Sequence, residues 1–202
     1  EDRMGIVVAD VSGKGVAAAL YMARLTRDLR YLALAESDPA RVIRWMNRAV
    51  LENGQDDLFV TLVYVVLDRR RRQFTFANAG HMPPMVRRGD TGQVVQLDGA
   101  AGLPLGIMAD GAYASEVYQL SPGDCVLLFT DGLVEAMSPA KEMFGTERLC
   151  TAFATRAGSA SDHLDRVIRA CQDHVLDAPQ FDDTTLVCFG LDAAPEAEVP
   201  IG

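Results

Sequence analysis

The chain has 202 residues, of which 49% are hydrophobic, and a formal net charge of −9. This length suits one domain or at most two small ones, and the apolar share allows a substantial core. The acidic charge argues against a nucleic-acid or anionic-membrane partner, and no apolar run approaches the ~20 residues that a membrane helix needs.

The first part of the chain predicts a strand and two helices. The strand GIVVAD ends at Asp10 and is followed by a tight glycine turn. A helix is expected over 16–36, because its apolar residues recur at steps of three and four. Asp38 and Pro39 then have the residue types of an N-cap and a first helical position. This second helix is expected to end near Asn53.

The middle of the chain is dominated by segments rich in β-branched and aromatic residues, separated by turn residues. We expect three hairpins, formed by 58–68 with 73–79, 85–88 with 93–97, and 113–120 with 124–130. Two further helices, over 146–156 and 161–176, and a last strand over 184–191 are expected to follow. Strands in hairpins with helices early and late predict an α+β fold with antiparallel sheets.

Acidic residues stand at the ends of three predicted strands. Asp10 and Asp131 each close a strand, and Asp182 and Asp183 precede the last one. If the last strand runs antiparallel to the others, these carboxylates meet at one edge of the sheets. Like charges held together repel, and a hard divalent cation such as Mg²⁺, Mn²⁺ or Ca²⁺ removes that cost. The alternative is that each aspartate only caps its own turn.

Six segments occur in a recognisable order, namely DVSGKGVAAAL, FVTLVYVVLD, NAGHMPP, GLPLGI, FTDGLVEA and DDTTLV. Together they resemble the SpoIIE/RsbU-type bacterial serine phosphatases of the metal-dependent PPM (protein phosphatase 2C-like) superfamily, over residues 5–191. The resemblance implies an α-β-β-α sandwich of two antiparallel sheets flanked by helices. We expect a phosphatase domain over 1–192 and a loose Pro- and Ala-rich tail over 193–202.

The resemblance also implies a chemistry and a set of site residues. It implies hydrolysis of protein phosphoserine or phosphothreonine by water activated at two Mn²⁺ or Mg²⁺ ions, with no phosphoenzyme. Asp10 resembles the bridging ligand, with the Val11 carbonyl as a backbone contribution. Asp131 resembles a ligand of the second metal, and Asp182 resembles the late metal-binding aspartate. Asp183 stands where relatives have Asn or Asp.

The histidine of NAGH allows two interpretations. His81 is the histidine nearest a motif, which suits a general acid. It also follows a strand and precedes two prolines, so it can simply shape a turn. Ser12 and Lys14 likewise suit either phosphate contact or the glycine turn.

The family carries an upstream acidic motif, similar to GGDxxD, that this sequence does not contain. The sequence is therefore expected to lack a first strand and one metal ligand, and the exposed sheet edge would favour pairing into a homodimer. The expected partner is a phosphorylated anti-anti-sigma-type (STAS) protein, in stress or developmental signalling, with a sensor or receiver domain upstream.

Two rival functions remain open from the sequence. One is a PPM-fold binding module that has lost turnover, and the other is a metal phosphoesterase acting on small molecules. A cytoplasmic location is expected, because the four cysteines show no CxxC spacing and suit buried reduced thiols.

Overall fold

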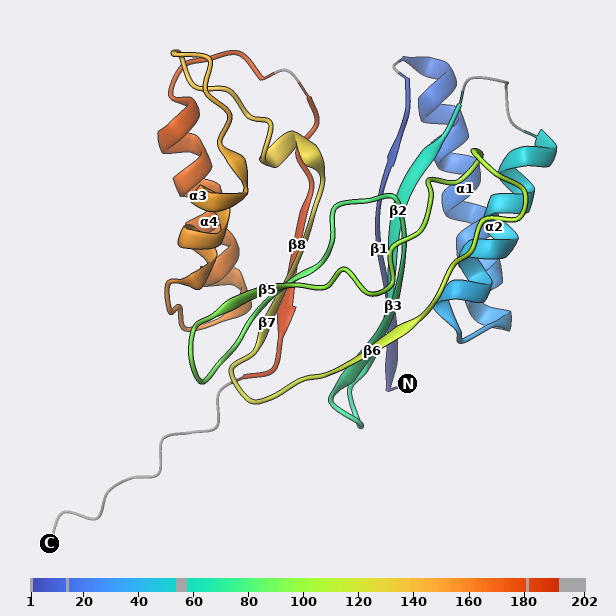
Figure 1. Cartoon of the computed structure of the whole chain (residues 1–202), viewed down its shortest axis with the longest axis horizontal. Helices are drawn as coiled ribbons and strands as arrows, with labels where there is room; N and C mark the ends of the chain where they lie inside the picture. Colours follow the sequence, from blue (N-terminus) through green and yellow to red (C-terminus); the bar gives the residue numbers. More distant parts are fainter. Residues whose placement is uncertain (1, 14, 54–57, 181, 193–202) are drawn as a thin grey trace, which may run out of the picture.

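The protein has four layers, in the order helices, sheet, sheet, helices. The computed structural model describes residues 2–13, 15–53, 58–180 and 182–192. Figure 1 shows α1 and α2 on one outer face and α3 and α4 on the other, with the two sheets between them. The predicted α+β sandwich is confirmed. The tail predicted over 193–202 lies outside the described residues.

Each sheet has four antiparallel strands. The first has the order β1 (Arg3–Val11), β2 (Val60–Asp68), β3 (Gln73–Ala79), β6 (Glu116–Gln119). The second has the order β5 (Val94–Gln96), β4 (Met85–Arg87), β7 (Cys125–Phe129), β8 (Leu186–Gly190). The helices are α1 (Val16–Ala35), α2 (Pro39–Asn53), the 3₁₀ turn η1 (Asp131–Leu133), α3 (Gly145–Ala154) and α4 (Ala160–Val175).

The hydrophobic core divides into three clusters, one for each interface between layers. Residues such as Val8, Phe76 and Leu128 pack between the two sheets. A second cluster joins α1 and α2 to the first sheet, and a third joins α3 and α4 to the second sheet. Because side chains alternate along a strand, successive residues of one strand enter different clusters. This explains why the strand sequences are almost continuously apolar.

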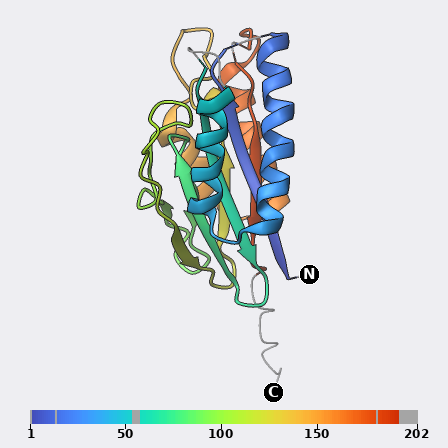
Figure 2. The ribbon, with the colours of Figure 1, turned by 90° about the vertical axis from the view of Figure 1, so that its right-hand side faces the viewer.

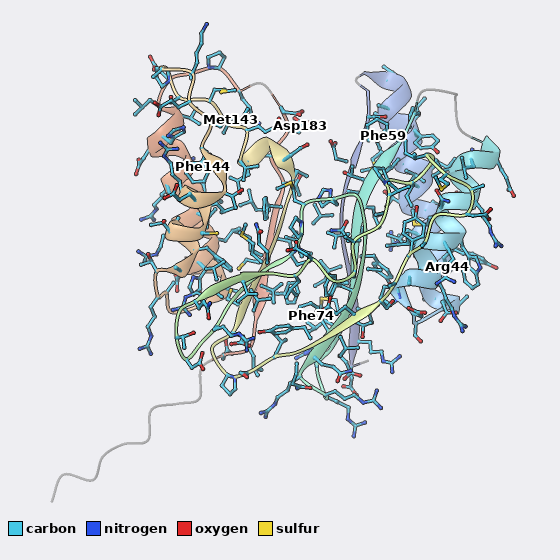
Figure 3. The ribbon with its side chains drawn as sticks, in the orientation of Figure 1. Arg44, Phe59, Phe74, Met143, Phe144 and Asp183 are labelled. Atoms are coloured by element: carbon cyan, nitrogen blue, oxygen red, sulfur yellow. The ribbon has the colours of Figure 1, made fainter. Side chains whose placement is uncertain are left out.

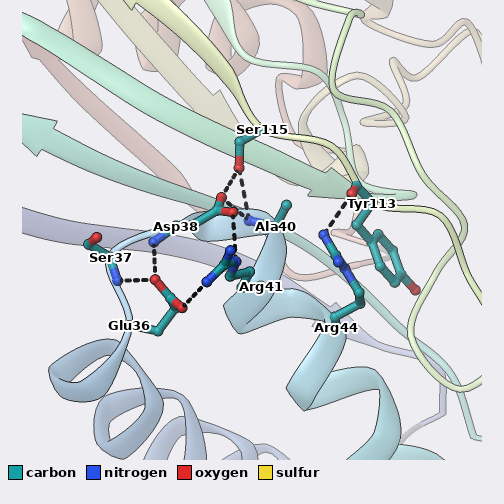
Figure 4. A network of polar contacts seen from close by, with 8 residues as sticks. All are labelled: Glu36, Ser37, Asp38, Ala40, Arg41, Arg44, Tyr113 and Ser115. Carbon is teal, nitrogen blue, oxygen red and sulfur yellow. Dashed lines mark hydrogen bonds and ion pairs between the residues drawn. The ribbon is translucent and has the colours of Figure 1, made fainter.

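The junction between α1 and α2 is held by the predicted N-cap. The backbone N–H of Ala40 donates to Asp38 Oδ1 at 3.1 Å and to Ser115 Oγ at 3.0 Å, and the Ser115 hydroxyl donates to Asp38 (Figure 4). Arg44 Nη2 donates to the carbonyl of Tyr113 at 3.3 Å. The start of α2 is thereby tied to the segment that leads into β6. Figure 2 shows both helices running along the face of the first sheet.

One predicted hairpin is wrong. β6 and β7 do not pair with each other, because β6 pairs with β3 in the first sheet and β7 pairs with β4 and β8 in the second. The turn predicted at 121–123 is present, but it carries the chain from one sheet to the other. Asp124 anchors it, since its carboxylate accepts the N–H of Ser121 at 3.0 Å and that of Gly89 at 2.8 Å. Turn residues specify a reversal and not the sheet in which the next strand pairs.

Two further features bear on the predictions. β1 is an edge strand of the first sheet. Among the described residues, none of the helices combines the length and the apolar character that crossing a bilayer requires.

Candidate active site

Asp10 stands at the open end of the space between the sheets. Ile6 and Val8 belong to the inter-sheet cluster, and the alternation of β1 places Asp10 on the same face, beyond the last apolar residue. Asp10 lies opposite Thr61 of β2 in the strand register. The Asp10 carboxylate thus lies at the boundary between the hydrophobic core and solvent.

The turn after β1 is fixed by a reciprocal pair of hydrogen bonds. The N–H of Ser12 donates to the carbonyl of Phe59 at 2.9 Å, and the N–H of Phe59 donates to Ser12 Oγ at 2.8 Å. Gly13 and Gly15 have φ values of 108° and 87°, which residues with a Cβ rarely adopt. Lys14 lies outside the described residues. Ser12 therefore shapes the turn, as one of its two interpretations proposed.

The second sheet brings two acidic segments together. β7 and β8 are antiparallel neighbours, so Asp131 after β7 and Asp183 before β8 meet at the same end. Thr130 Oγ1 donates to the carbonyl of Asp183 at 3.2 Å and accepts the N–H of Thr185 at 2.9 Å. A Cβ added at Gly132 would lie 2.4 Å from the Asp183 carbonyl oxygen. Glycine is thus required for this close approach.

The approach to β8 carries the other two predicted ligands in an extended turn. The strand begins at Leu186, two residues later than predicted, so Asp182 and Asp183 lie in the segment before it. The N–H of Asp183 donates to Asp182 Oδ1 at 2.9 Å, and Gln180 Nε2 donates to the Asp182 carbonyl at 2.8 Å. Both aspartate side chains are exposed. Figure 3 shows Asp183 at the same end of the sandwich as Phe59 of the facing layer.

Three of these four carboxylates line one cavity, and Asp131 lies close to it. Asp10, Val11, Asp182 and Asp183 line a cavity of about 900 Å³. Partial burial raises the pKa of Asp10, and the negative charges of Asp131, Asp182 and Asp183 raise it further. A hydrogen bond from the Val11 backbone lowers this pKa, but by less than the other causes raise it. The four aspartates that the sequence singles out are thus brought to one end of the sandwich, from both sheets.

The donor chemistry of this cavity fits Mg²⁺ or Mn²⁺. Carboxylate and backbone carbonyl oxygens are the ligands that hard divalent cations prefer. Among the described residues, no three His, Cys, Asp or Glu side chains converge tightly enough to enclose an ion in their present positions. Mutual repulsion between bare carboxylates keeps such groups apart, and a bound cation removes that repulsion. The cavity therefore has suitable oxygen donors without a closed cage.

His81 is buried behind this site. Its Nδ1 shares a hydrogen bond of 2.9 Å with Thr61 Oγ1. Asn78 closes the turn, since its Oδ1 accepts the N–H of His81 at 2.8 Å and its Nδ2 donates to the His81 carbonyl at 2.9 Å. Burial lowers the pKa of His81 to about 4, although the Asp131 carboxylate opposes the shift. A neutral, hydrogen-bonded ring favours the turn-shaping interpretation over general acid catalysis.

Three polar residues at the site were not selected from the sequence. Thr61 shares a hydrogen bond with the His81 ring. Thr130 donates to the backbone carbonyl of Asp183, and Gln180 donates to that of Asp182. Threonines are common in strands for their β-branching, so their type alone carries no signal. The position of Thr130 directly before Asp131, the acidic residue that follows β7, is the one feature that could have indicated it.

An α-β-β-α sandwich with aspartates from both sheets at one end defines the class of PPM-type phosphatase folds. The chain belongs to the family described as stage II sporulation protein E (SpoIIE), whose model matches residues 1–192.

Relatives and solved structures agree with this assignment. Phosphoserine phosphatase RsbU of Bacillus subtilis (strain 168) is 34% identical over 135 residues, which cover 67% of this chain and 40% of RsbU. Protein IcfG of Synechocystis sp. is 26% identical over 214 residues, covering 93% of this chain and 33% of IcfG. The chain thus spans well under half the length of these curated relatives. The SiaA-PP2C domain of Pseudomonas aeruginosa superimposes with a TM-score of 0.81 at 25% identity, covering 95% of this chain and 76% of that domain.

Proposed function

We propose that this chain is the catalytic domain of a metal-dependent protein serine/threonine phosphatase. The observation that carries the proposal is that Asp10 of the first sheet lines the same cavity as Asp182 and Asp183, which precede β8 of the second sheet. Asp131 lies near enough for its charge to raise the pKa of Asp10. Paired sheets bring these residues together although they are far apart in the sequence. Membership of the SpoIIE family and the similarity to phosphoserine phosphatase RsbU support the same activity.

In this proposal the resemblance to PPM phosphatases assigns each site residue a role. Asp10, at the mouth of the space between the sheets, would bridge two ions, with the Val11 carbonyl beside it. Asp131 and Asp182 would hold the second ion from the other sheet, and Asp183 would assist. When bound by these residues, two Mn²⁺ or Mg²⁺ ions would activate a water molecule and neutralise charge on the phosphoryl oxygens.

The remaining residues hold these ligands in place. Thr130 fixes the backbone of Asp183 and Thr185, so the approach to β8 keeps a constant position relative to Asp131. Gln180 fixes the Asp182 carbonyl. Ligands held by backbone hydrogen bonds lose little conformational freedom when a cation binds, which favours a defined geometry.

We extend the proposal to the biological context. The substrate would be phosphoserine or phosphothreonine on an anti-anti-sigma-type STAS protein in the cytoplasm. We also propose that a sensor or receiver domain precedes the phosphatase domain. Two copies of the chain would pair along the β1 edge. The edge position of β1 supports the pairing, because an edge strand presents unpaired backbone groups.

The test is phosphate release from a phosphoserine peptide with and without Mn²⁺, with Asp131→Asn as the control variant. We expect manganese-dependent release that the substitution abolishes, because one oxygen ligand loses its charge. No release would favour a binding module that has lost turnover, and release that neither Mn²⁺ nor Asp131→Asn affects would contradict the metal-dependent mechanism. Turnover of small phosphate esters but not of phosphoproteins would favour a small-molecule phosphoesterase.

A further inference from the structure

A large apolar groove opens beside the acidic cavity. Its volume is about 1120 Å³, and its walls come from η1 with the loop that follows, the C-terminal half of α4, and the connection to β8. Its apolar lining is supplied by Leu133, Met137, Ile168, Val175, Leu176 and Leu186. In Figure 1 these segments form the upper end of the α3/α4 side of the molecule.

The groove and the acidic cavity adjoin each other. Gln180 and Asp182 line both of them, and Gly132 and Thr184 lie in the wall of the groove next to the site. A peptide whose phosphorylated side chain enters the cavity therefore has the groove beside it. The two spaces differ in chemistry, since one presents carboxylates and the other presents mainly apolar side chains.

Leu176 gives the groove an unusual feature. It ends α4, where its N–H donates to the Gln172 carbonyl at 2.9 Å, and it has a φ of 53°. Glycine or asparagine is the usual residue at a helix end of positive φ. Here a leucine occupies the position with its side chain 71% exposed at the groove. An exposed apolar side chain held at a strained position calls for a function outside packing.

The size of the groove helps to identify its occupant. Pockets for drug-sized molecules span about 300–1,000 Å³, so a groove of about 1120 Å³ beside the acidic cavity has room for several side chains of a peptide. The exposed charges along it are three acids and one lysine, namely Glu135, Asp177, Asp182 and Lys141, and this balance gives no attraction for a second phosphate group. A peptide segment with apolar side chains fits this lining.

We propose that the groove binds the apolar residues adjoining the phosphoserine of the protein substrate and so selects which phosphoprotein is hydrolysed. The inference rests on the proposed phosphatase function. It assigns specificity to Leu176 and its neighbours on α4, which do not line the acidic cavity. The groove therefore acts on substrate affinity and not on the hydrolytic step.

The test uses two phosphoserine peptides of equal length and charge. One has leucine and valine beside the phosphoserine, and the other has asparagine and serine. Wild-type protein with Mn²⁺ should favour the apolar peptide by about tenfold in KM, since that is the effect of burying one to two apolar side chains. Leu176→Asn, which tolerates the positive φ, should abolish this preference. Hydrolysis of p-nitrophenyl phosphate should stay unchanged, because that ester does not reach the groove.

The matched control is Leu34→Asn, since Leu34 is 90% exposed on α1, far from the groove. This variant should keep the wild-type preference. Equal KM values of the wild type for both peptides, or an unchanged preference in Leu176→Asn, would overturn the proposal. A dimer that Leu176→Asn dissociates while peptide preference persists would instead make the groove a contact between copies.

Failure of the phosphatase function can be told apart from failure of the groove. Fluorescence anisotropy of the same labelled peptides measures binding without turnover. If p-nitrophenyl phosphate is not hydrolysed but the apolar peptide binds about tenfold tighter, the groove is supported and the enzymatic function is not. If hydrolysis occurs and both peptides bind equally, only the groove proposal fails.

Discussion

Gly132→Ala should disable the site by displacing one of its acidic segments. The added Cβ would lie 2.4 Å from the Asp183 carbonyl oxygen, whereas ordinary contact begins at 3.4 Å. The carbonyl must therefore move by about 1 Å, and displacements of that size at an active site can cost ~10²-fold in rate. Gly132 has no positive φ, so the backbone itself accepts alanine and the contact alone produces the effect.

The same contact predicts the loss of stability. Thr130 binds both the Asp183 carbonyl and the Thr185 N–H, so the Asp183 carbonyl cannot shift without straining these hydrogen bonds. Overpacking of this kind costs about 1–3 kcal/mol. For a domain of this size each kcal/mol lowers the unfolding temperature by about 2–4 °C. Thermal unfolding measures this term without reference to activity.

The assay for activity is Mn²⁺-dependent hydrolysis of a phosphoserine peptide over a range of metal concentrations. Gly158→Ala is the matched control, because its Cβ would meet only the end of the Asp162 side chain, at 3.0 Å, and that exposed carboxylate can turn away. We expect the control to behave as the wild type. The reasoning is refuted if Gly132→Ala keeps both the wild-type metal dependence and the wild-type unfolding temperature.

Three further predictions concern pH, helix capping and metal binding. Burial lowers the pKa of His81 to about 4 from its ordinary value of 6.5, so the unfolded state binds more protons between these pH values. The free energy of unfolding should be constant above pH ~6.5 and fall by about 1.4 kcal/mol per pH unit towards pH 4, about 3 kcal/mol in all. Urea unfolding of wild type and His81→Gln checks this, and an equal slope in both would contradict it. Asp38→Ala should lower stability by about 1 kcal/mol, because the N-cap of α2 is lost, and an unchanged urea midpoint would exclude that role. Asp131→Asn should raise the unfolding temperature of the metal-free protein, because repulsion on Asp10 is relieved, and should remove the stabilisation by Mn²⁺. A wild-type Mn²⁺-induced shift in this variant would show that Asp131 is not a ligand.

Local patterns were sufficient for most elements of the fold. The helix start at Asp38 and Pro39 was predictable, because capping depends on neighbouring residues only. The strand over 73–79 was predicted with its observed bounds. The order of the six motifs also identified the family. In each case the information lies within a few consecutive residues or in their order along the chain.

Pairing between distant segments was decided by the tertiary structure. The sequence around 121–123 does not indicate that the chain changes sheets there, because the strands that pair with β6 and β7 lie elsewhere in the sequence. Gly132 likewise packs against the carbonyl of Asp183, about 50 positions further along the chain. Thr61 shares its hydrogen bond with His81, 20 positions away. The sequence by itself determined which carboxylates are available and, to within a few residues, where the strands end. Only the packing of the two sheets brought these groups to one end of the sandwich, because convergence depends on how layers stack and not on local residue type.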